Sequence, residues 1–321
     1  MKAILVTGGA GYIGSQFANN LLDLGFKVII IDNLSTGHRR LVPKKASFYK
    51  GDLTNLNFLK KVLKKKKIEA VFHFAASLNV QESNTKPLKY FKNNVIATKN
   101  LLDTMIVCKI KYFIFSSTCA VYGDTNKKKV KENDNCVPKS YYGLTKLQCE
   151  NLIQLYGQEF KLKYAILRYF NVVGCDSKLR TGIINKGTLF KTIAANIHKN
   201  KYQIEVYGKD YKTKDKTCIR DYIDINDLTY LHIKSFEYIK KNKSILFNCG
   251  YQKPLSVLDI IKLFEKNIKN KIKKNFKTRR SGDIQEIYCD TTKLKKLFPK
   301  FIRKYSISKS IQNMIQWEQL A

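Results

Sequence analysis

The chain has 321 residues and a formal net charge of +35 at pH 7, and its apolar fraction of 44% is typical of a folded protein. No apolar run approaches the roughly eighteen residues that cross a bilayer, and the N-terminal apolar stretch is too short for a secretory signal. The eight cysteines never come closer than eleven residues, so neither a zinc ribbon nor a Cys-x-x-Cys motif is present. We expect a cytoplasmic protein with free thiols and no metal site.

The positive charge comes almost entirely from lysine, because the chain has only eight arginines. Such a charge can indicate binding to nucleic acid or to an anionic membrane. The lysines, however, punctuate amphipathic stretches such as 55–67, where Leu56, Leu59 and Leu63 form an apolar stripe. Compositional bias on solvated helix faces explains this pattern better, so we expect neither nucleic acid nor a membrane as a partner.

In chain order, apolar strand-like runs alternate with helical periodicity through the first half. Because the strands are continuously apolar and separated by helices, they predict a parallel sheet covered on both faces. This is the doubly wound (Rossmann) α/β fold, which binds ligands at the carboxyl ends of its strands. The expected strands are 3–7, 27–32, 47–52, 70–75, 112–117 and 165–170, and the expected helices are 13–24, 88–106 and 142–160.

The alternation loosens after about residue 170. Residues 171–223 are rich in loop signals and charge, and a later strand at 245–250 leads into a helix at 257–268. We expect a first, dinucleotide-binding domain over 1–170, with a contribution from about 224–246. A smaller interleaved substrate domain would cover 171–321.

The first strand ends in a glycine-rich turn, TGGAGYIG (7–14), that opens a helix. Glycines allow a pyrophosphate to approach the backbone and meet the free N–H groups of the helix N-terminus. Asp32, at the end of the second strand, can accept hydrogen bonds from both ribose hydroxyls and would repel a 2′-phosphate. The pattern predicts NAD, while the basic residues 38–40 leave NADP open.

The stretch SYYGLTK (140–146) contains two tyrosines and one lysine. Residues four apart share a helix face, so Tyr142 lies above Lys146, whereas Tyr141 has Thr145 in that place. An ammonium beside a phenol lowers the phenol pKa from its usual value of about 10, which would bring Tyr142 into range for proton transfer. The alternative is an exposed tyrosine beside an exposed lysine.

Three hydroxyl residues, Ser116, Ser117 and Thr118, end the fifth expected strand in FSSTCAVYGD (115–124). They would face the same crevice as the glycine turn, because carboxyl ends of parallel strands share one edge. Such residues can also cap the next turn. Together with the Tyr142–Lys146 pair, they suggest a hydroxyl that hydrogen-bonds a reacting sugar oxygen.

Taken together, these motifs resemble the extended short-chain dehydrogenases/reductases, and among them the UDP-hexose 4-epimerases, over essentially the whole chain. The resemblance implies that Tyr142 is the catalytic base, that Lys146 orients it and binds the nicotinamide ribose, and that Thr118 takes the catalytic Ser/Thr place. Other matching stretches are DNLSTG, GDL, HFAA, ES, KPLKYFKNNV, LRYFNVVG, YGKDYKTKDKTCIRDYIDINDL and RRSGD.

The same resemblance implies the contacts of the two ligands. NAD would be tightly bound and regenerated at each turnover, through Gly8, Gly11, Tyr12, Ile13, Gly14, Asp32, Asn33, Asp52, Leu53, Phe74, Ala75, Ala76, Asn93, Ser116, Tyr142, Lys146 and Phe170. A UDP-hexose would contact Thr118, Asn171, Thr188, Leu189, Tyr207, Arg220, Arg280, Asp283 and Ile287. Arginine suits a pyrophosphate because its guanidinium is a fixed, always-charged fork.

The implied reaction is the interconversion of UDP-glucose and UDP-galactose through a transient 4-keto sugar, in a homodimer. Related 4,6-dehydratases follow the active-site threonine with an Asp-Glu pair, whereas Cys119 and Ala120 stand here and argue against dehydration. A UDP-glucuronate epimerase or decarboxylase stays an alternative. A non-catalytic NAD-binding sensor is less favoured, because it would not need Thr118, Tyr142 and Lys146 together.

Three further positions bear on the substrate and the cofactor. Ile287 stands where some family members place a bulky tyrosine against the sugar, which predicts acceptance of UDP-GlcNAc and UDP-GalNAc as well. Leu78 stands where some epimerases carry a lysine, so one cofactor contact is expected to be absent. His73 is expected to be a packing residue in the core or near the cofactor, with no ligand role.

Overall fold

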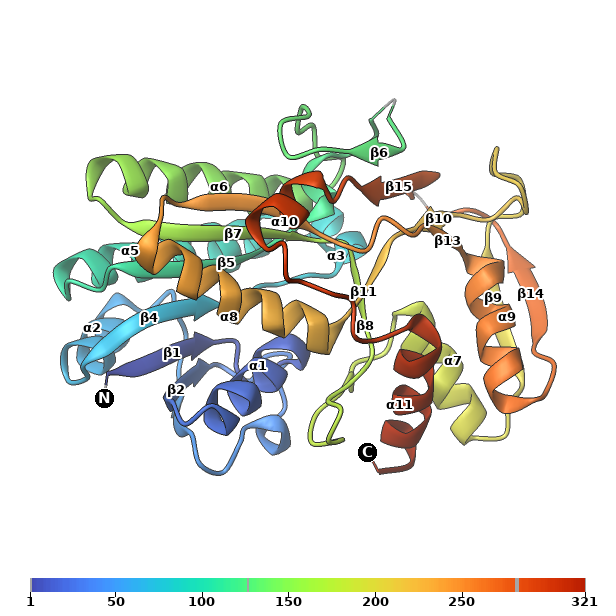
Figure 1. Ribbon diagram of the computed structural model, residues 1–321, viewed down its shortest axis with the longest axis horizontal. Coiled ribbons are helices and arrows are strands. Elements are labelled where there is room, and N and C mark those ends of the chain that lie inside the picture. The colour runs from blue at the N-terminus through green and yellow to red at the C-terminus, as the bar shows by residue number, and fades with distance from the viewer. Residues whose placement is uncertain (1, 126, 281–282, 321) are drawn as a thin grey trace. The chain divides into compact units, whose positions relative to one another are not determined.

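The computed structural model describes residues 2–125, 127–280 and 283–320 (Figure 1). The chain forms two compact units. No helix within these ranges is both long and apolar enough to span a membrane. The first unit comprises Met1–Asp124, Asn135–Arg168 and Thr229–Phe247, and the second comprises Thr125–Asp134, Tyr169–Leu228 and Asn248–Ala321.

The large sheet has seven strands in the order β12-β7-β5-β4-β1-β2-β3. Strand β1 pairs in parallel with both β2 and β4, β2 pairs in parallel with β3, and β4 pairs in parallel with β5. The strand order therefore reverses beside β1, as in a doubly wound fold, and the predicted fold class is confirmed. The strands are β1 (Ala3–Thr7), β2 (Lys27–Asp32), β3 (Ser47–Lys50), β4 (Ile68–His73), β5 (Tyr112–Thr118), β7 (Lys163–Tyr169) and β12 (Ile245–Cys249).

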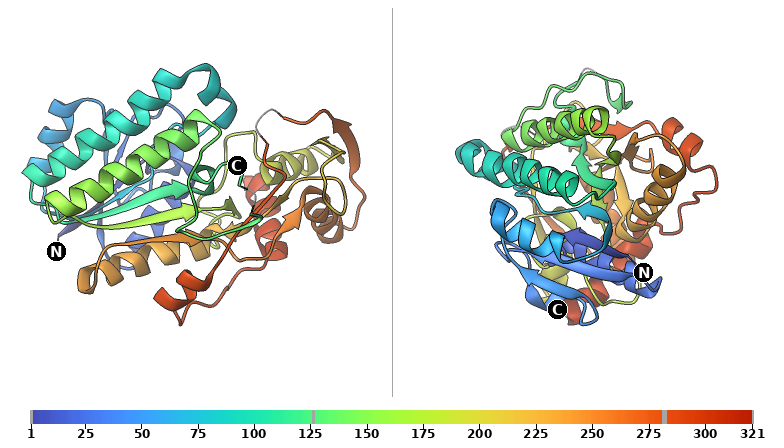
Figure 2. Two further views of the ribbon diagram at one scale, coloured as in Figure 1. Left: turned by 90° about the horizontal axis from the view of Figure 1, so that it is seen from above. Right: turned by 90° about the vertical axis from the view of Figure 1, so that its left-hand side faces the viewer.

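Helices cover both faces of this sheet, which explains its continuously apolar strands. On one face, the Phe17 ring of α1 lies 4.3 Å from Phe72 of β4 and 5.6 Å from His232 of α8. On the other face, α2, α5 and α6 bury a cluster that includes Leu59 and Ile153, and Figure 2 shows α5 and α6 side by side. The helices are α1 (Tyr12–Asp23), α2 (Leu56–Lys64), α5 (Ala97–Val107), α6 (Tyr141–Glu159) and α8 (Ile225–Lys241).

The single helix expected over 88–106 is instead three segments, α4 (Pro87–Tyr90), the π-helical turn η2 (Phe91–Ile96) and α5. Such π turns are rare and often occur at functional sites. The buried Asn94 accepts from the Ser77 N–H (2.8 Å) and donates to the Thr145 hydroxyl (3.0 Å). The turn therefore ties the loop after β4 to α6.

The described residues of the second unit form three small sheets: a mixed four-stranded sheet in the order β13-β10-β15-β6, and the parallel pairs β11–β8 and β14–β9. The fully buried Asp221 links several of its segments, because its carboxylate accepts from the N–H groups of Tyr222, Tyr251, Gln252 and Cys289. Helix α11 packs on α7 and α9.

The remaining elements are short or belong to the second unit. The helical ones are η1 (Arg39–Leu41), α3 (Val80–Thr85), η3 (Cys119–Val121), α7 (Leu189–His198), α9 (Val257–Ile268), α10 (Thr292–Leu297) and α11 (Ile307–Leu320). The strands are β6 (Lys129–Val130), β8 (Asn171–Val173), β9 (Gln203–Tyr207), β10 (Ile219–Arg220), β11 (Tyr222–Asp224), β13 (Leu255–Ser256), β14 (Lys273–Lys277) and β15 (Glu286–Cys289).

Candidate active site

The three predicted catalytic side chains lie together in the first unit. Thr118 is the last residue of β5, and its hydroxyl is hydrogen-bonded to the phenol of Tyr142 in the first turn of α6. The Ser140 hydroxyl caps α6 by accepting from the Gly143 N–H (3.1 Å). A side chain at Gly143 would meet the Ala120 carbonyl oxygen at 2.6 Å, so this glycine allows the helix to start against the residues that follow Thr118.

Lys146 lies one turn farther along α6 and is only 3% exposed. Its ammonium nitrogen is 4.3 Å from the centroid of the Phe115 ring, within the range of a cation–π contact. Burial lowers the Lys146 pKa to about 8, against smaller opposing effects of Cys149 and Glu150. The group is therefore mostly charged at neutral pH but close to its titration range.

The prediction that Lys146 acidifies Tyr142 is wrong for the protein residues alone. Burial raises the Tyr142 pKa to about 12, and the hydrogen bond from Thr118 opposes this shift only in part. Desolvation of the phenolate therefore outweighs any attraction from the neighbouring ammonium. Tyr142 holds its proton at neutral pH unless a further positive charge lies beside it.

The glycine turn between β1 and α1 leaves no room for side chains. Gly8 has a φ of +71°, and a side chain there would meet the Ala75 nitrogen at 2.5 Å; one at Gly14 would meet the Gly8 carbonyl oxygen at 2.3 Å. Helix α1 begins at Tyr12 after Gly11, which offers no side-chain cap. This bare helix N-terminus fits a pyrophosphate, which needs backbone N–H groups and a close approach.

Asp32 ends β2 beside this turn. Its carboxylate accepts from the N–H groups of Ala10 (3.0 Å) and Leu34 (2.8 Å), which fix its position. The next residue, Asn33, donates to Asp52 at 2.9 Å. The glycine turn and Asp32 thus fit the pyrophosphate and the ribose of a dinucleotide.

The other predicted cofactor residues occupy several segments. Phe74, Ala75 and Ala76 directly follow β4, and Ala75 abuts Gly8 as described above. Leu78, which stands where some epimerases carry a lysine that contacts the cofactor, is 67% exposed. Their individual contacts with NAD stay predictions. Tyr12 and Ile13 open α1, Leu53 follows Asp52, Asn93 lies in η2, Ser116 in β5, and Phe170 in the second unit.

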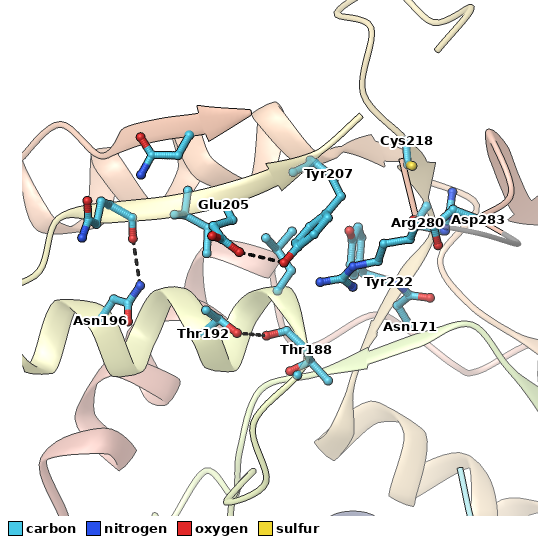
Figure 3. A pocket seen from close by; sticks show the side chains of 17 residues that line it. Asn171, Thr188, Thr192, Asn196, Glu205, Tyr207, Cys218, Tyr222, Arg280 and Asp283 are labelled. Carbon is cyan, nitrogen blue, oxygen red and sulfur yellow. Dashed lines mark hydrogen bonds between the residues drawn. The ribbon is translucent and has the colours of Figure 1, made fainter. Parts of the chain in front are cut away.

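A pocket of about 600 Å³ lies within the second unit (Figure 3). The Arg280 guanidinium lies 3.9 Å from the centroid of the Tyr207 ring, and the Thr188 hydroxyl caps α7 by accepting from the Lys191 N–H (3.4 Å). Ser281 and Gly282 of the matched RRSGD stretch lie outside the described residues. The predicted substrate residues that line the pocket are Asn171, Thr188, Leu189, Tyr207, Arg220, Arg280 and Asp283.

Ile287 is not among the residues that line this pocket. It pairs with Arg220 across β10 and β15, and its side chain is only 2% exposed. Its predicted contact with the sugar stays a prediction.

Glu205 is an acidic residue of this pocket that was not predicted from the sequence. Its carboxylate accepts a hydrogen bond from the Tyr207 hydroxyl (2.7 Å) and lies 3.6 Å from the Lys277 ammonium. The sequence of β9 contained a signal for this residue, because apolar and polar side chains alternate along the strand. Ile204 and Val206 are buried, so Glu205 and Tyr207 point to the other face. Thr192, Asn196, Gln203, Cys218, Tyr222 and Asn275 are further lining residues that were missed.

Comparison with known proteins assigns the family. The pattern of the NAD dependent epimerase/dehydratase family matches residues 4–250. The chain is 39% identical to the UDP-glucose 4-epimerase of Lactobacillus helveticus, over 90% of this chain and 89% of that protein. The chain belongs to this family. As a family member it is NAD dependent, in agreement with the glycine turn and Asp32.

Other family members similar to this chain differ in the sugar that they are named for. A putative UDP-arabinose 4-epimerase of Arabidopsis thaliana is 36% identical, over 99% of this chain and 80% of that protein. The crystal structure of the Bifidobacterium longum UDP-glucose 4-epimerase with NAD⁺ and UDP has a TM-score of 0.93 and 31% identity, over 99% of this chain and 98% of that one. The Campylobacter jejuni UDP-Glc/GlcNAc 4-epimerase has a TM-score of 0.85 and 34% identity, with both chains fully covered.

Proposed function

We propose that this protein is a UDP-sugar 4-epimerase that interconverts UDP-glucose and UDP-galactose through a transient 4-keto sugar. The observation that carries the proposal is the hydrogen bond between Thr118 and Tyr142, one helical turn from the buried Lys146. A hydroxyl pair of this kind can hold and transfer the proton of a secondary alcohol. The named relatives support 4-epimerisation as the reaction.

In the proposed reaction, Tyr142 takes the proton of the sugar 4-hydroxyl while Thr118 shares the hydrogen bond to that oxygen. When bound beside the glycine turn, NAD would supply the hydride acceptor and donor for C4 of the sugar and a positively charged ring. Because the Tyr142 pKa is about 12, the protein needs cationic charge at this point to form the phenolate. A bound nicotinamide ring would supply this further charge, and loss of the Lys146 ammonium above a pH of about 8 would make the phenolate harder still to form.

The second-unit pocket would anchor the UDP. Arg220 and Arg280 line it and would hold the pyrophosphate, while Tyr207 would pack against the uracil or ribose. Binding energy would thus be concentrated far from C4. A loosely held hexose can then present either face, as epimerisation requires.

The acetylated pair UDP-GlcNAc and UDP-GalNAc is the second candidate substrate. Ile287 in place of a bulky tyrosine and the likeness to the Campylobacter jejuni UDP-Glc/GlcNAc enzyme support it. UDP-arabinose is a further candidate substrate, because the similar Arabidopsis protein is named for it. A UDP-glucuronate epimerase or decarboxylase remains the alternative within the same chemistry.

The test is incubation of the purified protein, without added NAD, with each of these UDP-sugars, followed by NMR assignment of the C4 configuration. We expect inversion of UDP-glucose and UDP-galactose, and turnover without added NAD if the cofactor copurifies. Absence of C4 inversion in every sugar, with NAD also supplied, would contradict the proposal. Loss of carbon dioxide from UDP-glucuronate would favour the alternative.

We also propose that the protein acts in the cytoplasm as a homodimer. Support comes from apolar side chains exposed on packed helical segments of the first unit: Leu88 (82%), Phe91 (42%) and Leu155 (49%). A second copy of the same face would cover them. Light scattering should give twice the mass of the chain, and Leu155→Lys should shift the protein to monomer.

A further inference from the structure

A buried ion pair lies in the first unit close to the reaction residues. Arg168 of β7 donates to Glu150 of α6 from Nε (3.0 Å to Oε1) and from Nη2 (2.6 Å to Oε2). The Ser117 hydroxyl also donates to Glu150 Oε1. Glu150 is 0% and Arg168 is 4% exposed. A pair this deeply buried often contributes no more stability than apolar side chains of the same volume, so it invites another explanation.

Two members of this network of Glu150, Arg168 and Ser117 adjoin reaction residues, and the third lies near the turn that follows Thr118. Ser117 directly precedes Thr118, and Glu150 lies four residues after Lys146 on the same face of α6. The Arg168 guanidinium lies 4.9 Å from the centroid of the Tyr122 ring, just after the η3 turn. The network therefore joins β5, α6 and β7 where Thr118, Tyr142 and Lys146 are held.

The groups around Lys146 explain why a nearby carboxylate matters. Phe115 of β5 offers only its ring face. His73 of β4 contacts the hydroxyls of Thr7 (2.6 Å) and Thr98 (2.9 Å), and burial, together with Lys146, lowers its pKa to about 3, so it is neutral. Cys149 of α6 is also neutral, because burial raises its pKa to about 11. Tyr142 is a protonated phenol, as described above.

Glu150 lies one turn from Lys146 on the same face of α6, and its charge raises the Lys146 pKa. Its charge is held in place by the fork of Arg168 and by Ser117. We propose that Glu150 is a positioning residue that keeps the Lys146 side chain in its ammonium form, with Arg168 and Ser117 fixing the carboxylate. The importance of this charge for turnover rests on the proposed function; the effect on Lys146 itself does not.

The primary test measures Lys146 directly in the NAD-bound protein. The protein is labelled with [ε-¹³C]lysine, its Lys146 signal is assigned by its loss in Lys146→Arg, and the signal is titrated from pH 6 to 11. We expect Glu150→Gln to lower the titration midpoint by roughly one pH unit or more, since it removes the charge with little change in shape. Glu150→Asp, which keeps the carboxylate, should leave the midpoint within a few tenths of a unit.

Arg168→Lys is the matched control for disruption of the pair. It breaks the two-pronged contact but keeps the positive charge, so the midpoint should stay near that of the unchanged protein. An unchanged midpoint in Glu150→Gln, or an equal shift in all three variants, would overturn the proposal. Should Glu150→Gln fail to fold, Glu150→Met/Arg168→Met fills the space with apolar side chains and must show the lowered midpoint.

The second readout is the pH dependence of kcat with a UDP-sugar. We expect the alkaline limb of Glu150→Gln to move to lower pH while KM changes less than about twofold, and Glu150→Asp to restore the limb. If kcat falls equally in every variant with no movement of the limb, Glu150 has only a structural role. If Lys146 titrates as expected but no UDP-sugar is converted, the proposed function fails and the inference stands.

Discussion

The two units position functional side chains in opposite ways. In the first, Lys146 is 3% exposed, and its neighbours His73 and Glu150 are buried with their polar atoms bonded. In the second, Asn171, Thr188, Arg280 and Asp283 line an open pocket and are largely exposed. Burial tunes the protonation of the reaction residues, whereas permanent charge and hydrogen-bonding groups serve binding.

The two units also differ in the type of cationic side chain that they use. The first unit uses a lysine whose pKa burial brings down to about 8. The pocket of the second unit uses arginines, which stay protonated at any pH that the protein survives. Changes in pH should therefore act on the chemical step and leave nucleotide binding nearly unaltered.

The largest expected effect is in the first unit. Tyr142→Phe should lower kcat by about 10²–10⁴-fold, the usual contribution of a general acid–base, with little change in UDP affinity. NMR of C4 inversion measures kcat, and a thermal melt confirms folding. Tyr141→Phe is the matched control, because Tyr141 is the neighbouring tyrosine and is 47% exposed; its kcat should stay within about twofold of the unchanged protein. Full activity in Tyr142→Phe would remove Tyr142 from the proton transfer.

The second largest expected effect is a loss of UDP affinity when an arginine of the second-unit pocket is replaced. Arg280→Gln should weaken UDP binding by about 10–100-fold, since a charge-assisted hydrogen bond contributes about 1.5–3 kcal/mol. Calorimetric titration with UDP measures the change. Arg279→Gln is the control: Arg279 donates to Asp210 (2.7 Å), lies over Tyr211 and is not part of the pocket lining. Equal losses in both variants would indicate general electrostatic attraction.

The sequence predicted best those helices and strands whose apolar residues follow a clear periodic pattern. The strands 3–7 and 27–32 and the helix 257–268 match the structure in both bounds, because apolar runs with clear end signals define them. The helix at 88–106 did not match, because apolar spacing cannot show where a π turn inserts a residue. Asn94, which that turn positions, was missed for the same reason.

At the site, residue identities were more predictable than energies. The Tyr142–Lys146 spacing and the resemblance predicted which side chains come together, and the structure unites Thr118 with Tyr142. The sign of the Tyr142 pKa shift was wrong, because desolvation depends on the whole surrounding fold and not on one neighbour. Glu150 and Arg168 lie eighteen residues apart on different elements, so no local pattern pairs them.

A smaller expected effect is a pH dependence of kcat that the Kd for UDP does not share. The folded pKa of Lys146 is lowered, so its ammonium is lost as pH rises through about 8. We expect kcat to fall up to tenfold per pH unit above that value, while the Kd for UDP stays constant between pH 7 and 9.5. Parallel kinetic and calorimetric titrations test this. A Kd that rises with the same midpoint would place the titrating group in nucleotide binding.

The smallest expected effect concerns stability and Asp224, a buried carboxylate of the second unit. Burial raises its pKa to about 6, although Ser310 and Asn226 hydrogen-bond it. For an acid with a raised folded pKa, the ionised form is penalised on folding. The penalty is full above pH 6, and it disappears as pH falls toward the unfolded value of 3.8.

Asp224→Asn removes this penalty while keeping the shape. The amide oxygen can still accept from Asn226, and its N–H₂ can donate to the Ser310 hydroxyl. We expect the variant to be more stable by about 1–2 kcal/mol at pH 7 and equal to the unchanged protein near pH 4, in urea unfolding. The other carboxylates affect the free energy of unfolding of both proteins equally. The difference between the two proteins at each pH therefore reports Asp224 alone. A difference that did not vary with pH would mean that the pKa of Asp224 is the same in the folded and the unfolded protein, so that burial does not tune its charge.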